Sequence, residues 1–152
     1  MSRLLFLIHA LVHTLHGMRI PVLPGVINKL CIRIPFGCQI GNGTRLGKGT
    51  CLAYGGLGVV IHDRAVIGAR CYVGSGVTIG GTSGKFGVPV IEDDVIIYSG
   101  AKIIGDITIG AGSVIGANSV VTKNVPARSV VAGIPARILK ENIDIAAYRE
   151  AE

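Results

Sequence analysis

Large aliphatic residues recur at every sixth position along most of the chain. The series begins with Ile61, Ile67, Val73 and Ile79 and, after one missed position, continues with isoleucine or valine at 91, 97, 103, 109, 115 and 121. A helix repeats every 3.6 residues and a half-buried strand every two, so a period of six fits neither. It predicts a parallel β-helix, in which short strands stack coil upon coil and the aliphatic side chains form ladders inside.

A second set of mostly smaller residues accompanies the large aliphatic residues. Two residues earlier lie Ala65, Cys71, Val77, Val95, Ala101, Ile107, Ser113 and Ser119, and glycine directly follows five of the large residues, at 68, 74, 80, 110 and 116. We expect both positions to point inward and the glycines to form turns. Cys71 is then a small interior filler. A β-sandwich would instead place turn signals every 8–12 residues, which disfavours that alternative.

The repeat is interrupted at two places. Lys85 falls where an aliphatic residue is due, within "GGTSGKFGVP", so this stretch is predicted to leave the repeat as a loop. An earlier series, Ile40, Leu46 and Leu52, keeps the six-residue period but is offset by three positions, so the phase must change before Ile61.

The two ends of the chain differ from the repeat and define three segments. Residues 1–35 are predicted to form a helical N-terminal cap, with a helix over 2–16 that ends at Gly17 and a second short helix after "RIPVLP". Such a cap covers the open strand edges of the first coil. The β-helix then occupies 36–140, and 141–152 is predicted to form a C-terminal helix.

Composition narrows the class of protein. The 152 residues form one domain, and the four cysteines show neither zinc-finger spacing nor a disulfide pattern, which predicts a reduced, cytoplasmic protein. The chain has a net charge of +6, but its basic residues are not interleaved with the aromatic residues typical of a nucleic-acid-binding surface. We therefore expect no nucleic-acid partner. No metal is expected: His9, His13 and His16 have helical spacing without a carboxylate and predict a helix face that contacts a neighbour.

The segment "LLFLIHALVHTL" at 4–15 is too short to span a membrane. A secretory signal is disfavoured because histidines interrupt its apolar run and no clear cleavage site comes after it. We expect residues 1–16 to pack on a partner or to make a peripheral membrane contact.

The segments "VTIGGTSGK" at 77–85, "VPVIEDDVIIYSGAKIIGDITIGAGSVIGANSVVTKNVP" at 88–126 and "VVAGIPARI" at 130–138 carry a resemblance. In them the chain resembles the hexapeptide-repeat acyltransferases, and among these the serine acetyltransferase-like branch. The resemblance implies a left-handed β-helix, a homotrimer with active sites between neighbouring subunits, and acetyl transfer from acetyl-coenzyme A to a hydroxyl.

The chain departs from that branch in its acceptor motifs. In register with "AVIG" at 65–68, the Asp-His-Ala-Thr-Gly motif of serine-specific members falls on residues 54–58, "YGGLG", and their Arg-His-Pro motif falls on residues 87–89, "GVP". The "GG" followed by an aliphatic run and a histidine, with "HGMRIPVLPGVI" at 16–27, is similar to enzymes that decorate surface polysaccharides. We therefore expect a sugar hydroxyl as acceptor; the alternatives are a serine O-acetyltransferase of cysteine biosynthesis and a non-catalytic β-helix scaffold.

A hydroxyl acceptor needs a base within hydrogen-bond reach, and histidine suits this role. His62 is the only histidine of the β-helix, and Gly80 follows it by 18 residues, one coil of three hexapeptides. We therefore predict His62 as the catalytic base beside the glycine-rich loop. Tyr54 and Asp63 are predicted to bind the acceptor, and Asp63 could also orient the ring or simply form a turn.

Coenzyme binding needs backbone donors, a groove of small residues and basic groups for the phosphates. Gly80, Gly81 and Thr82 offer backbone N–H groups, and Lys85 lies in the same loop. The resemblance places the groove at Ser99 and Ala117, which are 18 residues apart and should stack. The predicted phosphate-binding cluster comprises Lys123, Arg128, Arg137 and Lys140.

Overall fold

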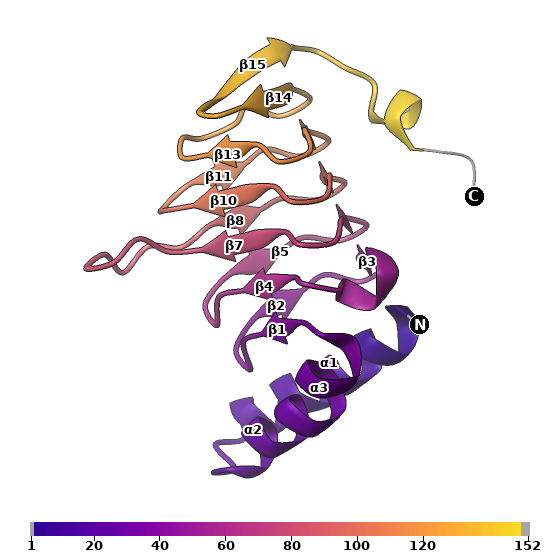
Figure 1. The fold of residues 1–152 in the computed structure, drawn as a ribbon, viewed down its shortest axis with the longest axis vertical. Helices are drawn as coiled ribbons and strands as arrows, with labels where there is room; N and C mark the ends of the chain where they lie inside the picture. The colour runs from indigo at the N-terminus through magenta and orange to yellow at the C-terminus, as the bar shows by residue number, and fades with distance from the viewer. Residues whose placement is uncertain (1, 150–152) are drawn as a thin grey trace.

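The computed structural model describes residues 2–149, which form a column of stacked coils on a helical base (Figure 1). Each full coil contributes one short strand to each of three sheets. Sheet A contains β1 (Gln39–Ile40), β4 (Val60–Ile61), β7 (Thr78–Gly80), β10 (Lys102–Ile104) and β13 (Val120–Val121). Sheet B contains β2 (Arg45–Leu46), β5 (Val66–Ile67), β8 (Val90–Ile91) and β11 (Thr108–Ile109).

Sheet C contains β3 (Cys51–Leu52), β6 (Tyr72–Val73), β9 (Ile96–Ile97), β12 (Val114–Ile115), β14 (Val130–Gly133) and β15 (Ala136–Lys140). All neighbouring strands are parallel except β14 and β15, which form an antiparallel hairpin over "VVAGIPARILK". We name the turns from sheet A to sheet B the first corner, those from B to C the second, and those from C to A the third.

The interior contains the two predicted positions of the repeat. The large aliphatic residues from Ile61 to Val121 are at most 2% exposed, and the smaller residues two positions earlier are all buried. Buried hydroxyls find partners: Ser113 Oγ donates to the Pro126 carbonyl at 2.8 Å, and Ser119 Oγ accepts from the Gly133 N–H at 3.1 Å. Cys71 is 1% exposed, and its burial raises the pKa of its thiol. The predicted ladders are confirmed.

Both interruptions of the repeat lie at corners. The phase offset arises at the third corner, where a 3₁₀ turn, η2 (Ala53–Gly56), comes after β3 and lengthens the coil. Tyr54, Gly55 and Gly56 all have positive φ there, which is costly for tyrosine and easy for glycine. The glycine-rich stretch leaves the first corner after β7 and projects as a loop from the column (Figure 1).

The cap consists of α1 (Ser2–Gly17) and a second helical stretch. That stretch runs through α2 (Leu23–Ile27), the π-helical η1 (Asn28–Arg33) and α3 (Ile34–Phe36). Leu5, Val12 and Ile32 close the core from below and are at most 1% exposed. The cap therefore covers the first coil as predicted.

Two of the three cap histidines join α1 to the first coil. His9 Nε2 lies 2.9 Å from the Thr44 carbonyl and His13 Nδ1 lies 3.2 Å from the Asn42 carbonyl. Burial lowers the pKa of His9, which favours its neutral form. The face that carries His9 and His13 thus packs on the chain's own first coil, whereas His16 is exposed.

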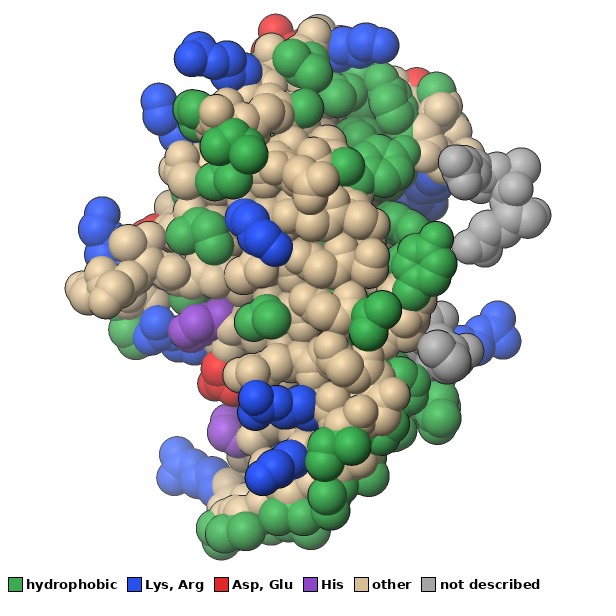
Figure 2. Space-filling model, in the orientation of Figure 1, with side chains coloured by type: hydrophobic (Ala, Val, Ile, Leu, Met, Phe, Trp, Pro, Cys, Tyr) green, Lys and Arg blue, Asp and Glu red, His purple; other side chains and the backbone are tan. Residues whose placement is uncertain are grey.

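The outer face of the cap is apolar. Leu4, Leu7 and Leu11 on α1 are exposed, as are Leu23, Val26, Leu30 and Ile34 on the second helical stretch, and Figure 2 shows hydrophobic side chains gathered at this base. No helix within residues 2–149 is long and apolar enough to cross a membrane. Peripheral contact through residues 1–16 and a cytoplasmic location stay predictions.

The helical structure at the C-terminal end is shorter than predicted within the described residues. Between Glu141 and Arg149 the chain forms only one 3₁₀ turn, η3 (Ile145–Tyr148), and residues 150–152 lie outside the described part. Asn142 has a left-handed φ of 56°, the Ile143 N–H donates to the Arg128 carbonyl at 3.0 Å, and Arg149 pairs with Asp94 at 2.6 Å. These contacts tie the segment to the second corner and replace local helical hydrogen bonds.

Close stacking of the coils makes a testable prediction at Gly47. A Cβ added there would lie 2.3 Å from the Ala69 nitrogen, whereas one added at Gly17 meets nothing within 4 Å. We expect Gly47→Ala to lower the free energy of unfolding by about 1–3 kcal/mol, since the coils must separate to admit it. Gly17→Ala is the control in the same chemical denaturation experiment, and equal unfolding free energies for the two variants would contradict the packing.

Candidate functional site

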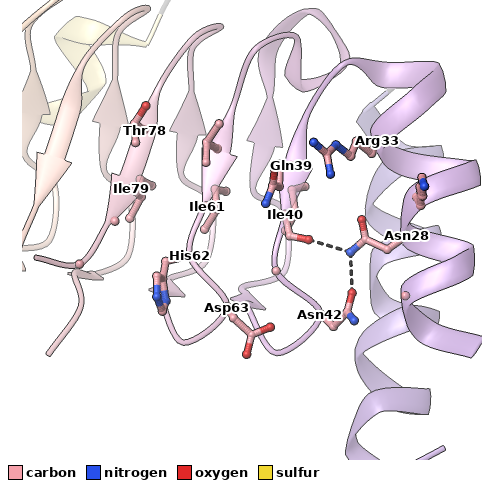
Figure 3. Close-up of a pocket in the computed structure, with 16 residues that line it drawn as sticks. Asn28, Arg33, Gln39, Ile40, Asn42, Ile61, His62, Asp63, Thr78 and Ile79 are labelled. Atoms are coloured by element: carbon pink, nitrogen blue, oxygen red, sulfur yellow. Dashed lines mark hydrogen bonds between the residues drawn. The ribbon is translucent and has the colours of Figure 1, made fainter. Parts of the chain in front are cut away.

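A groove of about 670 Å³ lies between the cap and the first corner. Its floor comes from the strands of sheet A, one wall from α2 and η1, and its far edge from His62, Asp63, Gly80 and Gly81 (Figure 3). The cap wall is anchored by Asn28, whose Nδ2 donates to the Ile40 carbonyl and to Asn42 Oδ1, each at 2.7 Å. The groove thus brings together two segments that are far apart in the sequence.

His62 lies where the repeat placed it, directly after β4. Its backbone N–H donates to the Ile79 carbonyl at 2.9 Å, so the residue stacks beside the start of the glycine-rich loop. The ring is half-buried, and its Nδ1 accepts from the Arg64 N–H at 3.2 Å. In a neutral imidazole this leaves the proton on Nε2. To remove a proton from an acceptor, the ring must release that single, exposed hydrogen bond.

Asp63 does not orient the ring. Its Oδ1 accepts from the Gly43 N–H at 2.8 Å, one coil below, and the described hydrogen bonds include none between Asp63 and His62. Figure 3 shows the carboxylate directed away from the imidazole. Asp63 still lines the groove, so its predicted role in acceptor binding stays a prediction, but its role as an orienting group is not supported.

Tyr54 is not brought together with His62 within one chain. It lies on η2 at the third corner, is 76% exposed, and does not line the groove. Its exposed ring and strained backbone, with φ of 52°, leave the hydroxyl free to meet a molecule outside the chain. A direct part in the His62 groove therefore requires another copy of the chain.

The glycine-rich loop is attached to the turn that carries His62. The Arg64 guanidinium lies 3.8 Å from the centroid of the Phe86 ring, and Gly87 packs against Asp106, where any Cβ would clash. Neither Gly81 nor Thr82 donates its backbone N–H in the described hydrogen bonds, and Gly81 lines the groove together with His62. Lys85 lies further out on the loop and is exposed. The contact between Arg64 and Phe86 could not be predicted from the sequence. Phe86 lies in the loop that leaves the repeat, so the six-residue period does not place it relative to Arg64.

The predicted coenzyme groove at Ser99 and Ala117 lies at the third corner. Ser75 Oγ donates to Ser99 Oγ at 3.3 Å, and the Asn118 N–H donates to the Ser99 carbonyl at 3.0 Å. Three successive coils thus present small residues in one ladder. This ladder is on a different corner from His62 and the glycine-rich loop, so one chain does not unite the two halves of the predicted site.

The predicted phosphate-binding residues do not form one cluster. Lys123 lies at the first corner after β13, whereas Arg128 lies at the second, where its Nε donates to the Ile143 carbonyl at 3.1 Å. Arg137 and Lys140 lie on β15, at the top of sheet C. All four lie near the C-terminal end of the column but on different sides of it. The chain passes from one sheet to the next every few residues, so residues that are close in the sequence are separated in space.

Within residues 2–149, no three histidine, cysteine or acidic side chains are placed to share a metal ion. Sequence reasoning missed the cap wall of the groove, where Arg33 extends from the end of η1 toward Gln39 (Figure 3). The only sequence signal for it was the excess of positive charge, which does not locate a side chain.

Comparisons with known proteins agree with the repeat architecture. Residues 89–123 match the family described as bacterial transferase hexapeptide (six repeats). The chain is 40% identical over 133 residues to the serine acetyltransferase of Synechococcus elongatus, covering 86% of this chain and 54% of that protein. It is 40% identical over 136 residues to the serine acetyltransferase of Bacillus subtilis, covering 88% of this chain and 62% of that protein. The chain therefore spans little more than half the length of these relatives.

Solved structures give the same result. A serine acetyltransferase from Brucella abortus strain S19, in complex with coenzyme A, matches with a TM-score of 0.85 at 36% identity, covering 90% of this chain and 54% of that one. A serine acetyltransferase in complex with cysteine matches with a TM-score of 0.85 at 31% identity, covering 91% and 54%. These matches confirm the resemblance and the left-handed β-helix that it implied.

The same comparisons overturn the expected sugar acceptor. These relatives and structures are named serine acetyltransferases, and their similarity extends over nearly nine-tenths of this chain. The expectation of a sugar or surface-polysaccharide precursor rested on two short motifs near the acceptor site. Those motifs concern only a few positions, whereas the similarity covers most of the chain.

The attachment of the loop can be tested by trypsin cleavage after Lys85. Replacing Arg64 by Gln removes the cation from the Phe86 ring and leaves the scissile bond unchanged. An exposed cation–π contact contributes about 0.5–1 kcal/mol, so we expect cleavage to accelerate by about 2- to 5-fold. Arg45→Gln, on β2 and away from the loop, is the matched control. Equal cleavage rates in wild type and Arg64→Gln, measured by mass spectrometry, would show that the contact does not hold the loop.

Proposed function

We propose that this hexapeptide-repeat chain, which is similar to the serine acetyltransferases, transfers an acetyl group from acetyl-coenzyme A to the hydroxyl of L-serine. The single observation that carries the proposal is the similarity to serine acetyltransferases over 86–88% of the chain. The geometry of the groove supports it, because His62 and Gly81, whose backbone N–H donates no described hydrogen bond, both line it.

Different residues of the chain have different roles in the proposed reaction. His62 accepts the proton of the serine hydroxyl, which is a poor nucleophile until that proton is leaving. The backbone N–H groups of Gly81 and Thr82 face the thioester and stabilise the negative charge that develops on its carbonyl oxygen. The loop that carries these donors is joined to the turn of His62 by the contact between Arg64 and Phe86.

The small-residue ladder fits a pantetheine arm. Ser75, Ser99 and Ala117 present small side chains on three successive coils at the third corner, and Gly100 packs so closely on Asn118 that no side chain fits there. Lys85 on the glycine-rich loop, Lys123 at the first corner, and Arg137 and Lys140 on β15 are exposed and offer charge for the phosphates. Arg128 contributes less, since its guanidinium already donates to a carbonyl.

A homotrimer unites the two halves of the site. His62 and the glycine-rich loop lie at the first corner, whereas the small-residue ladder and Tyr54 lie at the third. In a ring of three copies, the first corner of one copy faces the third corner of its neighbour. Tyr54 of that neighbour then has access to the acceptor, which accounts for its exposure in the single chain.

The acceptor and the base are tested together by thiol release from acetyl-coenzyme A. We expect turnover with L-serine and none with a panel of sugars, and we expect His62→Ala to reduce turnover by about 10²-fold or more. His16→Ala, an exposed cap histidine outside the groove, is the control and should retain wild-type turnover.

Each negative result would contradict a different part of the proposal. Absence of turnover with L-serine would contradict the proposed acceptor, and full turnover by His62→Ala would refute His62 as the base. If the purified protein shows no coenzyme A binding by calorimetry, the chain is a non-catalytic β-helix scaffold.

A further inference from the structure

The groove beside His62 has a cationic wall that the proposed chemistry does not use. Lys29 and Arg33, both on η1, line it and are exposed. Neither side chain takes part in a described ion pair, hydrogen bond or ring contact. Figure 3 shows Arg33 extending from the cap across to Gln39, over the open face of sheet A. The groove therefore presents a free guanidinium to any molecule that enters it.

The opposite edge of the groove carries the complementary charge. Asp63 lies beside His62 at the first corner, and one of its carboxylate oxygens remains free of described hydrogen bonds after Oδ1 accepts from Gly43. A molecule between the cap and this corner thus meets a cation on one side and an anion on the other. An α-amino acid has the matching pair of charges on one carbon atom.

The two groups belong to adjacent coils. Arg33 reaches the coil of Gln39 and Ile40, and His62 belongs to the next coil, because β1 pairs directly with β4. Adjacent strands lie about 4.8 Å apart. His62 also lies two residues past Val60, the partner of Gln39, so the long side chain of Arg33 must reach along the strand for one ligand to contact both groups.

The residues that the resemblance assigns to the serine carboxylate and amine are missing from the loop, where Gly87, Val88 and Pro89 stand instead. Resting on the proposed function, we propose that Arg33, with Lys29 beside it, binds the carboxylate of the acceptor amino acid. The N-terminal cap, rather than the glycine-rich loop, then determines acceptor specificity in this chain. A guanidinium is suited to this role because its planar fork matches a carboxylate in two parallel hydrogen bonds.

The test is Arg33→Gln, compared with wild type on L-serine and on L-serine methyl ester, which keeps the hydroxyl and the amine but has no carboxylate charge. Loss of a charged hydrogen-bonded contact predicts a rise of about 10- to 100-fold in KM for L-serine. KM for the ester and for acetyl-coenzyme A should stay within about 2-fold of wild type. Arg33→Lys, which keeps the charge without the fork, should lie between the two.

Arg3→Gln, an exposed cation on α1 outside the groove, is the control for lost positive charge. Arg33 is itself exposed, so thermal unfolding of Arg33→Gln should match wild type. An unchanged KM for L-serine, or an equal rise for serine and its ester, would overturn the proposal. A rise in KM for acetyl-coenzyme A alone would instead assign Arg33 to the coenzyme phosphates.

The KM comparison requires turnover, so a binding measurement keeps the proposal testable without it. If wild type shows no turnover with L-serine, the proposed function fails, but the groove can still be tested by calorimetric titration of L-serine in the presence of coenzyme A. Binding to wild type that is lost in Arg33→Gln supports the carboxylate site. Equal binding to both proteins, or binding to neither, contradicts it.

Discussion

The stacking of one coil on the next is the interaction on which the rest of the structure depends. The strands are too short to be stable alone, and those inside each sheet have their backbone groups satisfied by the coil below and the coil above. The interior ladder of isoleucine and valine holds those coils in register, because a slip of one residue would turn each aliphatic side chain outward. This register fixes where every corner residue lies relative to its equivalent one coil away.

The functional features are the places where the coil departs from this rule. The extra turn of η2 puts Tyr54 out from the third corner, and the glycine-rich loop leaves the first corner beside His62. Neither departure disturbs the ladder, since the chain returns to the same register at Ile61 and Ile91. The column thus supplies rigidity, and the corners supply groups that can contact ligands. The distribution of these groups over two corners favours a site shared between copies.

Periodicity in the sequence predicted the repeating part of the structure, but it could not predict contacts between unrelated segments. The coils, the interior position of Ser113, the loop after Gly80 and the stacking of His62 beside it all result from a repeat of six. The contact between Arg64 and Phe86 does not, because one partner lies in a non-repeating loop. The C-terminal segment favoured a helix locally, but its contacts with the second corner are stronger than that preference. The sugar acceptor was a wrong inference from short motifs.

Arg33 on η1 and His62 at the first corner line the same groove, so our proposal makes the cap a part of the acceptor site. The most direct test is a crystal structure of the protein with coenzyme A and L-serine. We predict the serine carboxylate on Arg33, its hydroxyl at His62, and the pantetheine arm between Gly81 of one copy and Ser99 of its neighbour. Serine bound outside the groove, or a complete coenzyme site within one copy, would contradict this assignment.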